Sequence, residues 1–352
     1  MKKQSILEAK YEAQKLAFAP YYFQVVVTLR KTGILTFIHS KKKGVSIQEI
    51  VDKFKITEYG VRTLLEAAES AGIVDYIDEN NVVITKVGYL VNFDQMTGVN
   101  INFMNDVCYD GAKHLTQSIQ NDKPEGLKEL GNWDTIYEGL SQLPDQIKKS
   151  WFEFDHFYSD DAFPYALPIV FEDNPNCIFD IGGNTGKWSF ACCEYNPNVK
   201  MKIFDLPGQI NVAKANAEEK GYLDRIDFYP IDLLDATQKI PKGADVVWMS
   251  QFLDCFSETE IITILKNVHQ AIDSETPVYI LETFVDNQKF EAAKYSLTAT
   301  SLYFTTMANG NSKMYRLTHM RKIVDAAGFD IVIEYPLIGN SYHTILKCVK
   351  RK

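Results

Sequence analysis

The chain has 352 residues, of which 46% are hydrophobic and 24% are charged, and its formal net charge is −9 at pH 7. This length predicts two domains, each with enough apolar residues for a core of its own. The acidic balance argues against nucleic acid as a partner, because phosphate binding needs a basic face. No apolar run approaches the ~20 residues of a membrane span, and the opening MKKQSILEAKYEAQ lacks the apolar segment of a secretory signal.

The six cysteines are scattered through the chain. None shows the paired spacing of a metal site, and the adjacent Cys192 and Cys193 suit neither a zinc ligand pair nor an easy disulfide. We therefore expect no bound metal and a soluble protein of the reducing cytoplasm, without a membrane partner.

The first domain is expected over residues 1–95. Segment 46–54 opens with the serine and glutamate of a capping box, and segment 57–74 has apolar residues at helical spacing between a threonine cap and a closing glycine. VDYI and NVVIT around DENN then predict a hairpin. Helix, helix and hairpin together are typical of a winged helix.

This domain is expected to form a homodimer rather than to bind DNA. Segment 6–34 is helical in pattern and more apolar than a lone surface helix needs, so we expect a two-fold dimer through residues 1–110. The would-be recognition helix, residues 57–72, carries three glutamates against one arginine, the wrong sign for phosphate.

Residues 96–172 are mostly helical and aromatic in pattern, and from residue 173 strands alternate with helices, which predicts a parallel, doubly wound α/β sheet. Strands are expected at 177–181, 200–205, 226–230, 245–250 and 277–282. FDIVIEYPL and SYHTILKCVK are joined only by IGN, too short for a crossover, so this last pair must be antiparallel. A parallel, Rossmann-like sheet that ends in an antiparallel hairpin is the shape of a class I methyltransferase domain, expected over 173–352.

The stretch FDIGGNTGKWS, residues 179–189, predicts a strand, a glycine turn and a helix. A phosphate-binding P-loop does not fit, because Gly182 and the Gly186-Lys187 pair lie one residue too close and Trp188 replaces the magnesium-binding hydroxyl. The dinucleotide-binding pattern G-x-G-x-x-G does not fit either, because the glycines here, Gly182, Gly183 and Gly186, are also one position out of place. A tight turn without any ligand remains an alternative.

S-adenosylmethionine (SAM) fits this turn. An acid, Asp180, ends the strand, and Gly182, Gly183 and Gly186 surround Asn184, which best tolerates a left-handed backbone after glycine. Glycines let the chain pass close to a cofactor. A carboxylate suits the positively charged sulfonium of SAM.

Two further acids support this interpretation. Asp205, followed by Leu206, ends the second strand, where an acid can accept from both ribose hydroxyls. Asp232 follows the third strand and can accept from the adenine amino group while Leu233 covers the ring. The carboxyl ends of parallel strands meet at one edge of a sheet, so these acids are expected at one site.

With these motifs the chain resembles the plant-type small-molecule O-methyltransferases and their bacterial polyketide-tailoring relatives over nearly its whole length. The likeness lies in the winged-helix domain, in FDIGGNTG, KIFDLPGQI and IDLL, and in the GF before the last hairpin. It implies SAM as the cofactor, a small-molecule acceptor, and an N-terminal domain that dimerises and helps close the partner's active site. The connector 96–172 would contribute to the acceptor pocket.

The catalytic element of that family is altered in this chain. The family pattern Leu-His-Asp-Trp-Ser-Asp follows the fourth strand, and its His is the base for the acceptor hydroxyl. QFLDCFSETE matches this pattern at Leu253, Phe256 and Ser257, and Asp254 stands in place of the His. Glu282 fills the place of the acid that orients the His.

Other family positions are matched in part. Met314 replaces a second acid, Asn309 matches an acceptor-contacting Asn, and Ser250 replaces a basic residue near the adenine. His156 and Phe157 lie on an aromatic helix where the family places acceptor-contacting residues. The alternative is that both are core residues, which is the commoner role of a lone His on an aromatic face and of an aromatic stripe at helical spacing.

Asp254 has three possible roles: a base if it is buried, a group that orients an anionic, carboxylate or amine acceptor, or a helix cap near Ser257. His343, on the last strand, is expected to lie far from the site. The leading function is methyl transfer from SAM to a small, aromatic or polyketide-like acceptor, with O-methylation first. The alternatives are a SAM-binding protein converted to other chemistry, and a ligand-sensing regulator.

Overall fold

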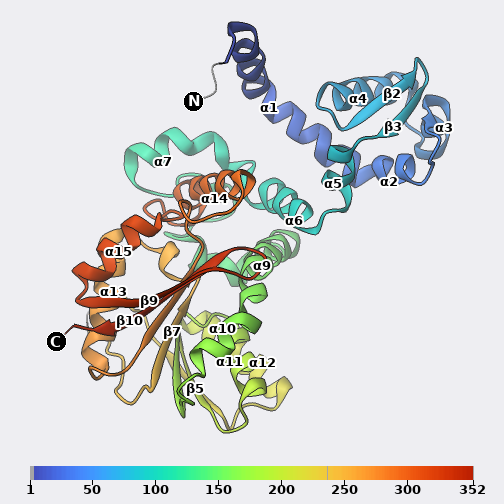
Figure 1. Cartoon of the computed structure of the whole chain (residues 1–352). Coiled ribbons are helices and arrows are strands. Elements are labelled where there is room, and N and C mark those ends of the chain that lie inside the picture. Colours follow the sequence, from blue (N-terminus) through green and yellow to red (C-terminus); the bar gives the residue numbers. More distant parts are fainter. Residues whose placement is uncertain (1–3, 236, 352) are drawn as a thin grey trace. The chain divides into compact units, whose positions relative to one another are not determined.

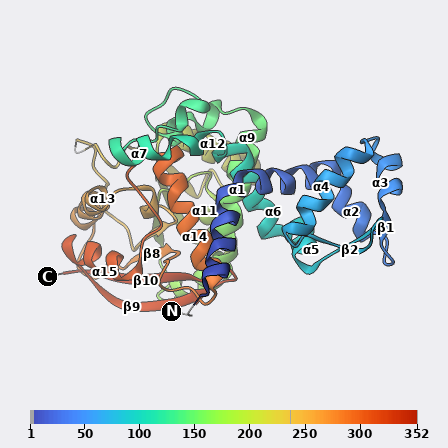
Figure 2. The same cartoon turned by 90° about the horizontal axis from the view of Figure 1, so that it is seen from above.

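The structure is a computed structural model that describes residues 4–235 and 237–351. The chain divides into two compact units, Met1–Asn105 and Asp106–Lys352. Figures 1 and 2 show the elements of each unit in two views. No described helix has the length and hydropathy that crossing a membrane would require.

The first unit has the predicted winged-helix elements. Its elements are α1 (Ile6–Thr32), α2 (Ile34–His39), β1 (Val45–Ser46), α3 (Ile47–Phe54), α4 (Glu58–Ser70), β2 (Val74–Asp78), β3 (Asn81–Ile84), α5 (Lys86–Phe93) and α6 (Gln95–Phe103). The strands form a small antiparallel sheet in the order β1-β3-β2. The predicted capping box starts α3, where the Ser46 hydroxyl accepts from Glu49 N–H and the Glu49 carboxylate accepts from Ser46 N–H.

Helix α1 is buried at one end and exposed at the other. Val27 and Leu29, near its C-terminus, are buried, whereas large apolar residues towards its N-terminus are exposed. The exposed ones are Ile6, Leu7, Tyr11, Leu16, Phe18 and Tyr21. Exposed apolar residues gathered on one helix are typical of an interface, and the expected homodimer remains a prediction that rests on them.

The second unit begins with helices α7 (Leu115–Asn121), α8 (Ile136–Gly139), α9 (Asp145–Ser159) and α10 (Phe163–Val170). The sheet strands are β4 (Cys177–Ile181), β5 (Lys200–Asp205), β6 (Ile226–Pro230), β7 (Val246–Ser250), β8 (Val278–Glu282), β9 (Phe329–Ile338) and β10 (His343–Lys350). The remaining helices are α11 (Lys187–Tyr195), α12 (Pro207–Lys220), α13 (Glu258–Ala271), α14 (Glu291–Tyr303) and α15 (Leu317–Ala326). The five predicted parallel strands and the antiparallel hairpin are all confirmed.

Within the described residues these strands form a single sheet in the order β6-β5-β4-β7-β8-β10-β9. Strand β4 pairs with β5 on one side and with β7 on the other, so the direction of winding reverses beside it. Ligands of doubly wound sheets bind at the carboxyl ends of the strands next to such a reversal. The fold therefore places the glycine turn after β4 at the expected position for a cofactor site.

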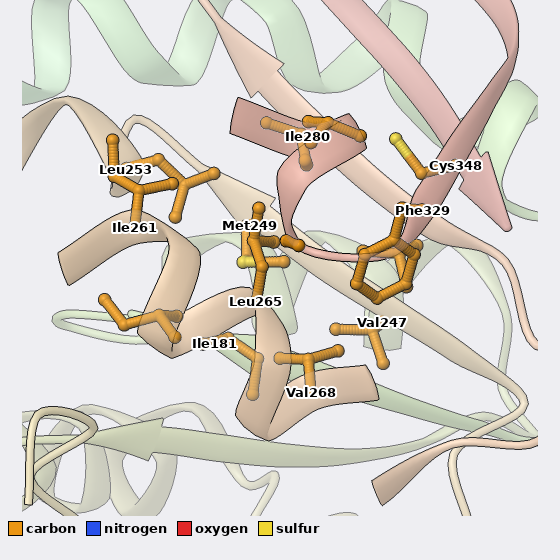
Figure 3. Packing of buried hydrophobic residues seen from close by; sticks show 14 of the residues in the cluster. Ile181, Val247, Met249, Leu253, Ile261, Leu265, Val268, Ile280, Phe329 and Cys348 are labelled. Carbon is orange, nitrogen blue, oxygen red and sulfur yellow. The ribbon is translucent and has the colours of Figure 1, made fainter. Parts of the chain in front are cut away.

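Both faces of the sheet are covered (Figure 1). One apolar core lies beneath α13 and α15, and Figure 3 shows Leu265 and Val268 of α13 against Met249 and Val247 of β7. The other core lies beneath α10, α11 and α12. Burial on both faces accounts for strands that are almost continuously apolar in sequence.

Candidate active site

The glycine turn has the predicted left-handed backbone. φ is +73° at Gly182, +47° at Asn184 and +89° at Gly186. A Cβ on Gly182 would lie 2.2 Å from the Phe252 ring, and one on Gly183 would lie 2.8 Å from Ile203. A side chain is therefore disfavoured at Gly182 by both φ and contact and at Gly183 by contact, and glycine lets the backbone approach a ligand closely.

Two of the predicted acids brace this turn. Asp180 is 2% exposed and accepts a hydrogen bond from the Ser189 hydroxyl at 2.7 Å, so it ties β4 to α11. Asp205 accepts from Asn184 N–H at 2.8 Å and from Leu206 N–H at 2.7 Å. Burial raises the pKa of Asp180 to about 7 and that of Asp205 to about 6. Each carboxylate keeps acceptor capacity beyond these bonds.

The residues predicted around the adenine have contrasting surroundings. Asp232 is exposed and accepts from Leu234 N–H at 2.9 Å, whereas Leu233 is 6% exposed. The Ser250 hydroxyl and the Asn184 side-chain carbonyl are buried, and neither has a hydrogen-bond partner among the residues that the structure describes. Buried polar atoms normally have partners, so these two fit a polar ligand at the carboxyl edge of the sheet.

The loop between β7 and α13 carries Asp254 and is held at both ends. The Glu282 Oε1 atom accepts from Phe252 N–H at 3.1 Å and from Leu253 N–H at 2.9 Å. At the other end, Asn309 Nδ2 donates to the Cys255 carbonyl at 2.5 Å. Glu282 therefore contacts the backbone of the loop and positions Asp254 through it.

Asp254 itself is buried and lies in a short 3₁₀ helix, Leu253–Cys255. It is 7% exposed, and its Oδ1 atom accepts a weak hydrogen bond from the Cys255 thiol at 3.5 Å. Burial raises the pKa of Asp254 to about 6. Burial, and then the charge of Asp254, raises the pKa of Glu282 well above its usual range.

One alternative for Asp254 is wrong. Helix α13 is capped by Ser257, whose hydroxyl accepts from Glu260 N–H while the Glu260 carboxylate accepts from Ser257 N–H. The capping box leaves no place for Asp254 as the cap, because an N-cap must lie directly before the first helical residue.

The acceptor-side residues lie on several elements of the second unit. Asn309 follows α14 and binds the Asp254 loop, and Met314 is 8% exposed. His156 and Phe157 lie on α9, with the His156 ring stacked on Phe152 at 5.7 Å between centroids. Burial, and then Lys187, lowers the pKa of His156 to about 4, so its imidazole is neutral at pH 7.

Sequence reasoning missed Asp155, the residue before His156. Its Oδ2 atom accepts from the Asn184 side-chain amide at 3.2 Å, which links α9 to the glycine turn. Burial, and then the charge of Asp254, raises the pKa of Asp155 to about 7. The helix also carries Glu153 and Asp145, so nothing in the sequence distinguishes Asp155 from a surface acid, and its neighbours in space could not be read from the sequence.

The expectation that His343 lies far from the site is wrong. His343 is fully buried, and its Nε2 atom is 3.1 Å from Nε2 of Gln251, the residue after β7. Strand β10 runs antiparallel to β8, so its first residue lies at the edge where the parallel strands end. Its pKa falls to about 4 through burial, so the ring is neutral.

Comparisons with known proteins agree with the fold described above. A family model described as an O-methyltransferase domain matches residues 172–330, and one described as a Dimerisation2-like domain matches residues 10–81. L-tyrosine C(3)-methyltransferase of Streptomyces lavendulae is 22% identical over 82% of this chain and 78% of that protein. Norreticuline-7-O-methyltransferase of Papaver somniferum is 26% identical over 57% of this chain and about half (52%) of that protein.

Solved structures show the same fold. The S-adenosylmethionine-dependent methyltransferase SibL has a TM-score of 0.72 at 19% identity and covers 96% of this chain and 98% of that chain. The O-methyltransferase NcsB1, solved with S-adenosyl-L-homocysteine and 1,4-dihydroxy-2-naphthoic acid, has a TM-score of 0.68 at 18% identity, with 94% and 96% covered. The chain therefore belongs to the SAM-dependent methyltransferases that join an O-methyltransferase domain to an N-terminal dimerisation domain.

Proposed function

We propose that this protein transfers the methyl group of SAM to a small aromatic acceptor, most readily to an oxygen atom, and that Asp254 is the ionisable group beside that acceptor. The single observation that carries the proposal is the loop of Asp254, which is buried and fixed at both ends beside the glycine turn. The named substrates of the relatives, norreticuline and L-tyrosine, are aromatic, and their methylated atoms are oxygen and carbon respectively.

The residues at the carboxyl edge fit the cofactor. SAM supplies an electrophilic methyl group on its sulfonium. We assign the ribose hydroxyls to Asp205, the adenine to Asp232 and Leu233, and the unpartnered side-chain atoms of Asn184 and Ser250 to polar groups of the cofactor. The backbone of the glycine turn and Leu206 complete the proposed cofactor contacts. Asp180 holds the turn in place through its hydrogen bond from the Ser189 hydroxyl.

Asp254 would take the proton of the acceptor hydroxyl or hold the acceptor in line with the methyl group. A free Asp, with a pKa of ~3.9, is a poor base for a phenol of pKa ~10. Burial raises the pKa of Asp254 to about 6, which narrows this mismatch. Positioning lowers the barrier further, because a fixed loop holds the reacting groups in one geometry. His156, Phe157, Asn309 and Met314 are proposed to line the acceptor side.

We also propose the three segments expected from the sequence. They are a dimerisation domain over 1–95, a connector over 96–172 that contributes to the acceptor pocket, and a SAM-binding domain over 173–352. We further propose a cytoplasmic homodimer whose partners are small molecules and not nucleic acid. The apolar residues exposed on α1 support the homodimer.

The direct test is methyl transfer from methyl-labelled SAM to a panel of phenols and catechols, with products identified by mass spectrometry. We expect a labelled product with the wild type and a strong loss with Asp254→Asn. Saturable SAM binding without any labelled product across the panel would favour the alternative of a SAM-binding protein with other chemistry.

A further inference from the structure

Gln251 is the first residue after β7 and begins the loop that carries Asp254. Its φ is +45°, in the left-handed region that glycine adopts freely and other residues adopt only at a cost. Its backbone N–H donates to the Leu281 carbonyl of β8 at 2.9 Å. A residue other than glycine persists in this region where the surrounding structure fixes it, and such positions gather at functional sites. The side chain of Gln251 is therefore expected to have a role that glycine could not fill.

The partner of the Gln251 side chain is His343, the first residue of β10. Their Nε2 atoms are 3.1 Å apart, and because the amide nitrogen can only donate, the imidazole nitrogen accepts. The imidazole can accept only while it is neutral, and burial keeps it neutral at pH 7 by lowering the pKa of His343 to about 4. His343 is 0% exposed, and a buried polar ring is costly unless its hydrogen bond is made.

Hydrogen bonds brace the chain on both sides of His343. Before it, Asp161, between α9 and α10, accepts from Asn340 N–H at 2.6 Å and from the Asn340 side-chain amide at 2.8 Å. After it, the Thr344 hydroxyl accepts from the Asn287 side-chain amide at 2.8 Å. His343 is therefore a fixed point at the carboxyl edge of the sheet, from which the side chain of a neighbouring loop can be held.

The residues after Gln251 connect this fixed point with the glycine turn. A Cβ on Gly182 would lie 2.2 Å from the Phe252 ring, so this ring packs directly on the turn. The same ring contacts Phe256 edge-on at 4.8 Å between centroids, which brings the two ends of the loop together around Asp254. A change in the backbone at Gln251 would therefore move Phe252 and Asp254 together.

We propose that His343 and Gln251 are positioning residues for methyl transfer. Through its hydrogen bond to Gln251, His343 sets the place of Phe252 against the glycine turn and the place of Asp254 in the active site. This inference rests on the proposed function and adds two residues to it. Neither side chain needs to touch the acceptor. A misplacement of about 1 Å can cost about a hundredfold in rate, so losing this hydrogen bond should lower kcat more than it raises KM.

Hydrogen–deuterium exchange tests the position of the loop without any acceptor, on the full-length protein saturated with S-adenosylhomocysteine. His343→Leu removes the accepting nitrogen and keeps a buried side chain of similar size. We expect exchange over residues 251–257 to become at least about threefold faster, because the loop opens more easily without its brace. His343→Gln, whose amide oxygen can accept in place of the imidazole nitrogen, should restore most of the protection. Unchanged exchange in His343→Leu overturns the proposal.

A second variant approaches the hydrogen bond from the other side. Gln251→Asn should fold, because asparagine tolerates a positive φ, but its side chain is one methylene too short to reach His343. In the methyl-transfer assay, Gln251→Asn and His343→Leu should each lower kcat about tenfold or more, with KM for SAM within about twofold of wild type. The double variant should lose no more than either single variant, because both changes remove the same hydrogen bond.

Thr344→Val is the matched control. Thr344 is the next residue on β10, is equally buried, and would lose its own hydrogen bond to Asn287. This variant should lower the melting temperature but keep kcat within about twofold of wild type. Unchanged kcat in both single variants, multiplied losses in the double variant, or an equal loss in Thr344→Val contradicts the positioning role. A wild type that methylates no phenol would reject the proposed function, whereas the exchange measurement would still decide whether His343 holds the loop.

Discussion

Replacing Asp254 with Asn should make the fold more stable at pH 7 while removing methyl transfer. Burial raises the pKa of Asp254 from 3.8 to about 6, so at pH 7 the folded protein must hold an ionised carboxylate in a place that disfavours it. A shift of about 2 units at ~1.4 kcal/mol per unit corresponds to a destabilisation of up to ~3 kcal/mol. Asparagine has nearly the same shape and carries no charge.

The effect has a defined pH dependence. Since the folded pKa lies above the unfolded one, the folded state binds more protons between pH 4 and pH 6, and wild-type stability falls as pH rises through that window. Asp254→Asn has no carboxyl group to titrate at this position. The difference in unfolding free energy by which it exceeds the wild type should therefore be largest above pH 6 and shrink to less than ~1 kcal/mol at pH 4.

Denaturant unfolding at pH 4 and pH 7 measures the difference in unfolding free energy between variant and wild type at each pH. Thermal unfolding gives a second measure, because each kcal/mol shifts the melting temperature by ~2–4 °C. The variant should also retain cofactor affinity and lose methyl transfer by ~10²–10⁴, the usual effect of removing a general base. The wild-type rate should rise as pH passes about 6 and then level off, because the carboxylate form is needed. An Asn variant that is less stable than wild type at pH 7 would refute the argument from burial.

Three further results are expected. Asp205→Ala should weaken S-adenosylhomocysteine binding by ~1.5–3 kcal/mol in calorimetry, the scale of lost hydrogen bonds to a charged group; an unchanged affinity would remove the ribose assignment. Gly182→Ala should abolish that binding and lower the melting temperature, because its Cβ would lie 2.2 Å from the Phe252 ring; wild-type behaviour would show that the turn tolerates a side chain. Sedimentation should give about twice the 40.1 kDa chain mass, and Leu16→Glu, at a site 77% exposed, should shift the population to single chains; a wild-type particle of one chain mass would reject the dimer.

Local patterns in the sequence determined most of the fold. The five parallel strands, the capping box at Ser46 and the left-handed Asn184 follow from side-chain periodicity, from hydrogen bonds within a few residues, and from sterics at a single residue. The short IGN link also required β9 and β10 to be antiparallel. Each of these signals is complete within about a dozen residues, so the sequence alone displays it.

The tertiary structure decided the environment of the reacting groups. Asp254 is buried because Glu282 and Asn309, 28 and 55 residues further along the chain (282 − 254 and 309 − 254), hold its loop at opposite ends. Asp155 meets the glycine turn through Asn184, and His343 reaches the carboxyl edge because its strand runs in the opposite direction to β8. A pKa depends on burial and on charges that are distant in sequence. Chain packing therefore determines which polar groups meet at the site, and no local pattern records it.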